Sequence, residues 1–572
     1  MRWEPGLDDG PTSSRFAVVD YNGDTGRVQP PARWSAERRT FVKGRAALGS
    51  RHVDTPQGRQ VNLWALLQYA LEFYEGPPGL GRPIPWGFEG NRLTVVPHAG
   101  LGENAFYDRK SKSLQFYYFG TETDRVYTCL SADIVYHELA HAILDGVRPY
   151  YSEGASVETG AFHEFMGDIS AVLLTLRNNK FRGVIAEQTA GDLSAAENLS
   201  SIAAEFGRRT SGRPYLRSAK NRTTMSAVAG LPSVHTVSQV LTAAMFDILL
   251  ALTGKYLERQ KEEHAAGTRK SKPSAKAAFW NAIQRMQRLT VQPLDLLPPV
   301  DVTFRDYALA VLRSHQLADP LDPHGYFGMM LDAFVKREIL DAADRAALTA
   351  DRYLYERETF AVFHDIDSIS HSRAGAYRFL NDNREQLYIP LGTDLVVADL
   401  YDANKYGRAA MRLPRQIVLE YVWREDVVLD DARFGRFKGQ ITTLLCGGTL
   451  VFDDKGKVLS WARKPGTGIA ADEQRLGWPS RCDSQLKNDW YAELAAGEAR
   501  RQRMLDALAT RIARGHIGLT SGGQRGMIAD RVPPLTAESH EGTVQFMLSP
   551  HLHISDDDYD DEAGGRRWQI SS

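Results

Sequence analysis

Residues 133–169 read DIVYHELAHAILDGVRPYYSEGASVETGAFHEFMGDI, and an H-E-x-x-H pattern begins at His137. We expect a helix here, because apolar residues recur around the pattern and neither Gly nor Pro interrupts it. On a helix, His137 and His141 lie on one face, one turn apart, so both imidazoles can reach a single ion. Glu138 lies beside the first His and can point at a water held by that ion. H-E-x-x-H is the pattern of zinc hydrolases, although the bare pattern also arises by chance.

The second half of this stretch supplies a third candidate ligand. Apolar residues recur with a helical period from Phe162 to Leu176, which predicts a second amphipathic helix. Glu164 and Asp168 lie four positions apart on another face of that helix. Glu164 can ligate zinc, and Asp168 can accept the free N–H of a ligand His, which fixes the orientation of the ring. Three protein ligands and a fourth position left to water are typical of a catalytic zinc site.

The segments HELAHAILDG and GAFHEFMGDISAVL together resemble the zinc core of the thermolysin-like metalloproteases, the gluzincins. In that family the second helix carries a Glu ligand and, four residues later, an Asp that supports a ligand His. Glu164 and Asp168 match these two positions. The resemblance therefore implies one zinc ion bound by the two His side chains and Glu164. From His141 to Glu164 is 164 − 141 = 23 positions, a few more than in thermolysin, which predicts a longer loop around 148–157.

A candidate substrate strand lies upstream of the zinc helix. Residues 103–107, a polar turn and residues 114–119 predict a β-hairpin. Thermolysin-like enzymes carry an N-A-F-aromatic segment on the edge strand above the zinc, so the resemblance implies that Asn104 and Ala105 contact the substrate backbone. An edge strand presents N–H and C=O groups to which an extended peptide can add as another strand. The alternative is a purely structural hairpin.

Two further segments match motifs of the same family. A Leu-Arg-Ser string places Leu216 and Arg217 where the family walls the pocket after the scissile bond and binds the substrate carbonyl. A Val-His pair that opens an apolar helix resembles the catalytic His segment, and an imidazolium at His235 could stabilise an oxyanion. Tyr150 is a second oxyanion candidate, and Ile134 would favour an apolar residue after the cut. The alternatives are a surface Arg and a His at a helix N-terminus. Unlike the family, this chain has no acidic residue just before the His.

The composition is that of an ordinary globular protein. The 572 residues include 69 basic and 71 acidic side chains, so no broad electrostatic field points to nucleic acid or to an acidic membrane. Cys129, Cys446 and Cys482 form neither a metal-ligand spacing nor a disulfide framework, and free thiols are favoured over a single disulfide. The acidic clusters that bind calcium in secreted relatives are not evident, so zinc is the expected cofactor and calcium is not expected.

The N-terminal segment MRWEPGLDDGPTSS has neither the basic region nor the apolar run of a signal peptide. The sequence also has no run of about 18 apolar residues, the length needed to span a membrane. We therefore expect a cytoplasmic protein, with export by a signal-independent machine as the alternative.

The expected fold class is α+β, in three parts. Residues 1–155 form a β-rich N-terminal lobe that ends in the zinc-binding helix. Residues 156–343 form a helical lobe that carries the third zinc ligand and the catalytic His. These two parts correspond by resemblance to a thermolysin-like catalytic unit. Residues 344–572 form a C-terminal α+β domain of unknown role, to which the resemblance does not extend.

Within the C-terminal domain, residues 484–514 predict a long charged helix and Val544 begins a final strand. His551 and His553 could bind metal, although such pairs are more often surface features. In the helical lobe, the charged residues 258–275 predict an exposed loop. The four other stretches predicted as strands are 387–401, 417–423, 441–452 and 458–462.

The resulting interpretation is a zinc endopeptidase for polypeptide substrates, in which Glu138 takes a proton from the zinc-bound water. Two alternatives stay open. An aminopeptidase on the same zinc core would need carboxylates that hold a free α-amine, and Glu103 and Asp108 are the nearby candidates. A zinc-stabilised binding module would have no turnover and would act through its C-terminal domain, but the presence of both Glu138 and His235 argues against it, because a scaffold has no use for a base beside the metal. Nucleic acid and membranes are not expected partners, and the C-terminal domain could dock a protein partner.

Overall fold

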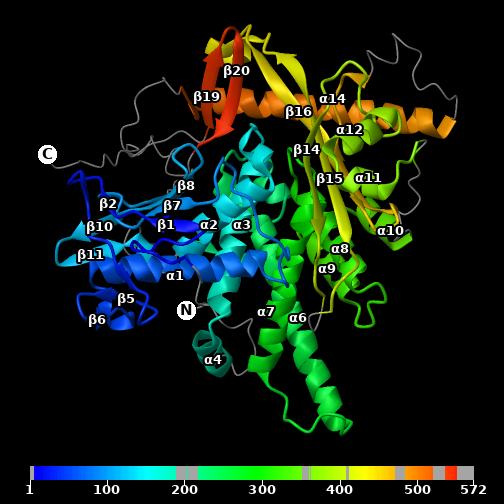
Figure 1. Ribbon diagram of the computed structural model, residues 1–572. Helices are drawn as coiled ribbons and strands as arrows, with labels where there is room; N and C mark the ends of the chain where they lie inside the picture. Colours follow the sequence, from blue (N-terminus) through cyan, green and yellow to red (C-terminus); the bar gives the residue numbers. More distant parts are fainter. Residues whose placement is uncertain are drawn as a thin grey trace.

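The computed structural model describes residues 6–188, 201–202, 217–350, 360, 362–407, 411–469, 484–519 and 535–549. Small sheets and a group of helices make up the chain to about residue 350, and a larger sheet with its own helices follows (Figure 1). This mixture confirms the expected α+β class. The division of the first part into thermolysin-like lobes stays a prediction.

A four-stranded sheet in the order β1-β7-β9-β8 forms the centre of the N-terminal part. The pairs β1–β7 and β7–β9 are parallel, whereas β8 and β9 are antiparallel with Ala105 opposite Phe116. The predicted hairpin is therefore confirmed, and β8 is an edge strand. The strands of this sheet are β1 (Phe16–Val18), β7 (Leu93–Val96), β8 (Ala105–Asp108) and β9 (Ser113–Phe116).

Short paired strands surround this sheet. They are β2 (Tyr21–Asn22), β3 (Arg27–Val28), β4 (Arg33–Ser35), β5 (Thr40–Lys43), β6 (Ala46–Ala47), β10 (Tyr118–Thr121) and β11 (Asp124–Tyr127). Helix α1 (Pro56–Glu75) packs beside them and begins where the Thr55 hydroxyl accepts the N–H of Gly58, with Pro56 at the first helical position.

Three helices carry the candidate site, and local sequence sets where two of them begin. α2 (Ala132–Val147) contains the H-E-x-x-H pattern. α3 (Val157–Leu176) begins at Ser156, whose hydroxyl accepts the N–H of Thr159 at 3.4 Å. α6 (Val234–Ala265) begins at Ser233, which caps Thr236 in the same way at 3.2 Å. α3 packs against both α2 and α6.

Helix α6 differs from the sequence expectation at its far end. The helix continues to Ala265, so the prediction of a loop from residue 258 is wrong for its first eight residues. Charged residues there lie on an exposed helical extension rather than in a loop. By length and composition alone α6 could cross a membrane, but 72% of its most apolar window is buried, and packing against α3, α7 and α9 accounts for that apolarity. The other helices of this part are α4 (Asn179–Gln188), α7 (Ala275–Val291), α8 (Phe304–Ala318), α9 (Tyr326–Lys336) and α10 (Ala342–Ala350), and β12 (Ser201–Ile202) pairs with β13 (Arg217–Ser218).

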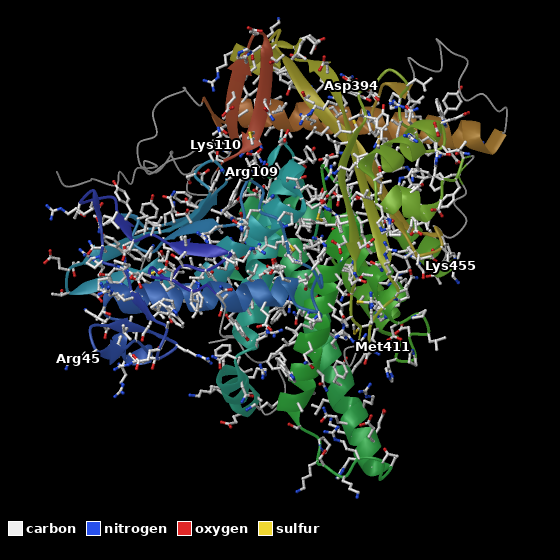
Figure 2. All side chains as sticks on the ribbon, in the orientation of Figure 1. Arg45, Arg109, Lys110, Asp394, Met411 and Lys455 are labelled. Carbon is white, nitrogen blue, oxygen red and sulfur yellow. The ribbon has the colours of Figure 1, made fainter. Side chains whose placement is uncertain are left out.

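The C-terminal part contains a seven-stranded sheet in the order β14-β15-β16-β20-β19-β18, with β17 also paired to β16. Its strands are β14 (Val396–Ala403), β15 (Gln416–Val428), β16 (Ile441–Phe452), β17 (Val458–Lys464), β18 (Ile517–Leu519), β19 (Leu535–His540) and β20 (Thr543–Leu548). Helices α11 (Ile366–Ser370), α12 (Arg373–Asp382) and α14 (Ser484–Ala513) belong to the same part. Arg109 and Lys110 of the N-terminal part lie at the foot of the β19–β20 hairpin (Figure 2).

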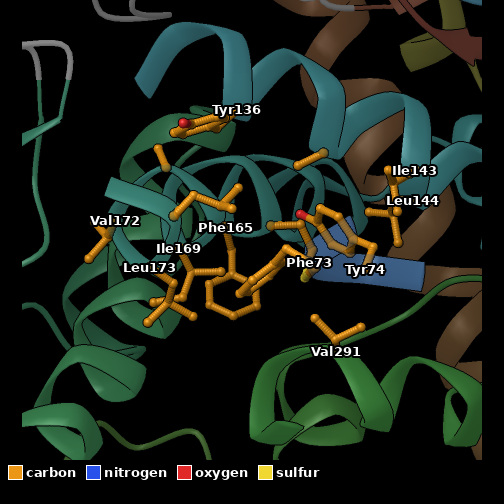
Figure 3. Close-up of a cluster of buried hydrophobic side chains, with 14 of the residues drawn as sticks. Phe73, Tyr74, Tyr136, Ile143, Leu144, Phe165, Ile169, Val172, Leu173 and Val291 are labelled. Carbon is orange, nitrogen blue, oxygen red and sulfur yellow. The ribbon is translucent and has the colours of Figure 1, made fainter. Parts of the chain in front are cut away.

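One hydrophobic core extends through both expected lobes of the first part (Figure 3). Helices α1, α2, α3 and α7 contribute to it beneath the candidate site. Full burial of such a side chain stabilises the fold by about 1.5–3 kcal/mol, so this core holds the three site helices firmly together. The core side chains of this region include Phe73, Tyr74, Tyr136, Ile143, Leu144, Phe165, Ile169, Leu173 and Val291.

The C-terminal sheet has a second core, which is not separate from the first part. Ala155, in the loop between α2 and α3, is buried within this second core. A smaller cluster joins Val300 to Val422 and Leu445 of the sheet. The C-terminal sheet therefore packs directly against the loop that connects the two site helices.

Candidate metal centre

Helix α2 brings the three predicted side chains of the H-E-x-x-H pattern together. One donor atom from each of His137, Glu138 and His141 lies within 4.8 Å of the others, a geometry that could hold a metal ion. The two imidazole ring centres are 4.8 Å apart. All three side chains are buried, and Glu138 is 0% exposed. The pattern is therefore on the inner face of the helix.

Helix α3 places the predicted third ligand opposite these side chains. The carboxylate oxygens of Glu164 lie 3.6 Å from His137 Nε2 and 3.9 Å from His141 Nε2. On the far side of the first ring, Asp168 Oδ1 lies 3.1 Å from His137 Nδ1. That contact leaves Nε2 of the same ring directed at Glu164, so one imidazole contacts two carboxylates from successive turns of α3.

The charge balance of this cluster suits a cation. Burial alone would lower the pKa of His137, but the carboxylates of Asp168 and Glu164 outweigh burial and raise it to about 9. Three carboxylates in a region of low dielectric favour positive charge beside them. Two imidazole nitrogens and a carboxylate are also the donor set that zinc takes in a catalytic site. The residues present therefore fit a zinc ion.

A glycine that the sequence analysis missed completes this packing. A β-carbon built on Gly167 would lie 2.5 Å from Nδ1 and Cε1 of His137, closer than side-chain carbons approach other atoms. The ring therefore occupies the space that any larger residue at this position would fill. A glycine inside a helix, between Glu164 and Asp168, was the available signal, since glycine is unfavourable in a helix interior.

His235, the second residue of α6, reaches the same site from a third helix. Its Nδ1 lies 2.8 Å from Glu164 Oε2, and the side chain is 5% exposed. The sequence offered no acidic residue just before His235 to orient it, and in the structure Glu164 is the carboxylate beside it. The site thus combines side chains from α2, α3 and α6.

The candidate substrate strand begins next to Asn104. Asn104 precedes β8, its side chain accepts the N–H of Ala105 at 2.8 Å, and its carbonyl accepts the N–H of Tyr117 at 3.1 Å. Ala105 is fully buried. The two residues therefore lie at the start of an edge strand, as expected, with their local hydrogen bonds formed within the hairpin.

Of the remaining predicted substrate residues, the structure describes Ile134 in full and only the backbone of Arg217. Ile134 is buried in the main core on α2, three residues before His137. The backbone of Arg217 lies in β13, paired with Ile202, and its side chain is outside the described residues. Leu216 also lies outside them, as do Cys482, His551 and His553. Cys129 and Cys446 are buried free thiols.

Tyr150, a predicted oxyanion residue, contacts the C-terminal sheet. Its ring packs against Val300 and the sheet residues Val422 and Leu445, and the charged groups that perturb its pKa are Glu153, Arg424, Glu420 and Arg373 rather than metal-site residues. Burial is the main cause of the raised pKa of this hydroxyl. The contacts described for Tyr150 are thus with the C-terminal sheet, and its oxyanion role stays a prediction.

Glu103 and Asp108, the two candidate carboxylates for an aminopeptidase, have other surroundings than such a site would need. Asp108 accepts the N–H groups of Lys110 and Ser111 at 3.1 and 2.9 Å and so shapes the turn after β8. Glu103 is half-buried, and that burial raises its pKa. These observations do not favour either side chain as a site for a substrate amine.

Comparison with known proteins adds little to this geometry. No protein-family model matches the chain, and no curated protein matches it. Among solved structures, 11 chains match, including the precursor of protealysin, a metalloproteinase from Serratia proteamaculans. That match has 14% sequence identity and a TM-score of 0.32, and it covers 52% of this chain and 83% of the other. A likeness this weak carries no argument, so the function must be argued from the site itself.

Proposed function

We propose that this protein is a zinc-dependent peptidase that hydrolyses peptide bonds with a metal-bound water. The observation that carries the proposal is the meeting of α2 and α3: the H-E-x-x-H side chains face Glu164 at 3.6 and 3.9 Å, with Asp168 behind His137. This arrangement supplies two His ligands, a Glu ligand and an adjacent carboxylate that can act as a base.

Each side chain has a distinct task in this proposal. Zinc, when bound, lowers the pKa of a water and polarises the scissile carbonyl. Glu138 accepts the proton of that water and passes it to the leaving amine. Asp168 holds the tautomer of His137 through its Nδ1. His235, beside Glu164 at the opening of α6, donates a hydrogen bond to the developing oxyanion.

The substrate in this proposal is a polypeptide that adds to β8. An edge strand offers main-chain groups for an extended peptide, and Asn104 and Ala105 lie at its start. Ile134 and Leu216 would favour an apolar residue after the cut. Internal cleavage, a cytoplasmic location and a protein partner for the C-terminal domain all stay predictions.

The test compares wild type with Glu138→Gln, both loaded with zinc, on short peptides and on an unfolded protein. Mass spectrometry identifies the fragments. We expect cleavage by wild type and a loss of at least about a hundredfold in the variant, since general-base catalysis contributes roughly 10²–10⁴-fold. Equal zinc content in both proteins and equal cleavage would show that Glu138 is not the base.

One observation favours a second candidate, a zinc site that only supports the fold. Glu138 is 0% exposed and the three proposed ligands are at most 5% exposed, so the site is shielded from solvent. In that case zinc would bind stoichiometrically and its removal would lower stability, but no peptide would be cleaved.

A further inference from the structure

Strand β8 packs against α2, and its far end lies beside the last turn of that helix. Asp145 lies one turn beyond His141 on α2. The hydroxyl of Tyr107, near the end of β8, donates to Asp145 at 2.7 Å, and Arg109, just after the strand, forms an ion pair with it. A peptide paired with β8 would therefore extend away from the metal ligands, toward the turn that follows β8.

The β19–β20 hairpin of the C-terminal sheet stands at that turn. Lys110, two residues after β8, forms an ion pair with Glu538 of β19. Figure 2 labels Arg109 and Lys110 directly beneath this hairpin. Although the hairpin is more than 400 residues away in the sequence, it thus contacts the N-terminal part at the far end of β8.

The same hairpin also contacts the loop after α2 and the first turn of α3. The amide of Gln545 donates to Glu153 in the loop after α2 at 3.0 Å. At the end of β20, Leu548 lies against the first turn of α3: a β-carbon on Gly160 would be 3.6 Å from its Cδ2. The hairpin therefore reaches from the β8–β9 turn to the start of the helix that carries Glu164.

From these contacts we propose that the β19–β20 hairpin closes the substrate path beyond β8. Only peptides with few residues before the cleaved bond would then fit. The proposal rests on the peptidase function proposed above and narrows it from internal cleavage to cleavage near an N-terminus. Antiparallel pairing is the more stable choice, and it puts the N-terminus of the substrate at the Asp108 end of β8. The four residues of β8 pair with about four residues of an extended peptide.

The test uses nested peptides that share one cleavable core, extended by zero to twelve residues at either end. With wild type, we expect kcat/KM to fall at least about tenfold once more than roughly four residues precede the cut. Extensions at the C-terminal end should have little effect. Equal rates for all N-terminal lengths, or a restriction on the C-terminal side instead, would overturn the proposal.

Charge reversal tests whether the hairpin is the cause. Glu538→Lys places two ammonium groups together, so we expect long N-terminal extensions to be cleaved several-fold faster, with short peptides unchanged. The double variant Lys110→Glu with Glu538→Lys should restore the restriction. Lys112→Glu is the matched control, because Lys112 lies in the same turn but donates to the carbonyl of Glu89. If Glu538→Lys cleaves long N-terminal extensions as slowly as wild type does, the hairpin is not the cause of the length restriction.

A binding measurement separates this proposal from the peptidase function. Zinc-loaded Glu138→Gln is titrated into the same peptides, labelled with a fluorophore at the C-terminus, and anisotropy reports the affinity. If wild type cleaves no peptide, the peptidase proposal fails. Weaker binding of long N-terminal extensions would still support a closed path, and equal binding of all lengths would refute it.

Discussion

Arg148, the residue that follows the metal-site helix, forms a buried ion pair with Glu420 in β15 of the C-terminal sheet. A second buried group lies beside them: Asp295 is 2.8 Å from Arg82 and 3.0 Å from Lys405. These basic groups outweigh the effect of burial and hold the pKa of Asp295 well below its usual range. The helix that carries the proposed zinc ligands therefore ends in an ionic contact with the domain that sequence reasoning kept separate.

We predict that Glu420→Ala destabilises the whole protein. The substitution leaves the guanidinium of Arg148 buried without its carboxylate, and breaking a buried pair in this way costs about 3–5 kcal/mol. Urea unfolding measures the change. Asp399→Asn is the matched control, because Asp399 on β14 pairs with Arg373 at 3.4 Å with both side chains exposed, and such pairs contribute at most about 1 kcal/mol. Equal effects of the two substitutions would contradict the prediction.

Asp168→Asn should weaken zinc binding without unfolding the protein. The amide keeps the shape of the side chain but loses the negative charge that orients and supports His137, and loss of such a partner lowers metal affinity roughly 10–100-fold. Competition with a chromogenic chelator measures the affinity. Asp133→Asn, in the first turn of α2, removes the same charge outside the ligand set and should leave zinc affinity unchanged.

Gly167→Ala should disrupt the site by contact alone. The added methyl group would lie 2.5 Å from the ring of His137, so the imidazole must turn away from Glu164. We expect loss of stoichiometric zinc and of any peptidase activity. Gly254→Ala is the control, since Gly254 lies inside α6 with open space around it, and the exchange there should stabilise the helix by about 0.5–1 kcal/mol. Full zinc occupancy in Gly167→Ala would show that the ring tolerates the methyl group.

Local patterns in the sequence predicted the centre of this molecule well. The spacing of four predicted that His137 and His141 share one face of α2, because helical geometry decides which side chains share a face. That Glu164 faces them was implied by the family resemblance, and its carboxylate lies 3.6 and 3.9 Å from the two rings. The β8–β9 hairpin followed from alternating residues on either side of a polar turn. The predictions of strands β15 and β16 were also confirmed. Their sequences contain long runs of β-branched and aromatic residues, which favour strands.

Contacts between distant segments could not be read from such patterns. The packing of Tyr150 against Val422 and Leu445 is one such contact, because these partners lie in the C-terminal sheet, far along the chain. The ion pair of Arg148 with Glu420 also joins residues that are far apart in the sequence. The end of α6 was missed for a different reason: its last two turns are charged and exposed, so they lack the apolar period that marks a packed helix, and helix propensity decides there instead.

A half-buried carboxyl at the start of α3 should make stability depend on pH. Burial raises the pKa of Glu158 from 4.5 to about 7, although its carboxylate accepts the N–H of Phe304 at 2.6 Å. A carboxyl with a higher pKa in the folded chain holds its proton more tightly there. The protonated Glu158 therefore stabilises the folded state fully below about pH 4.5, and this contribution to the free energy of unfolding is lost as the pH rises to about 7.

Glu158→Gln should remove that dependence, because the amide stays neutral and can still accept the N–H of Phe304. Relative to the variant, wild type should lose about 3 kcal/mol of unfolding free energy between pH 4.5 and 7.5, since each pKa unit corresponds to about 1.4 kcal/mol. Urea unfolding at both pH values measures the difference. Glu262→Gln, at an exposed position on α6, controls for the change in net charge. A stability difference that does not vary with pH would show that Glu158 titrates alike in the folded and unfolded chains.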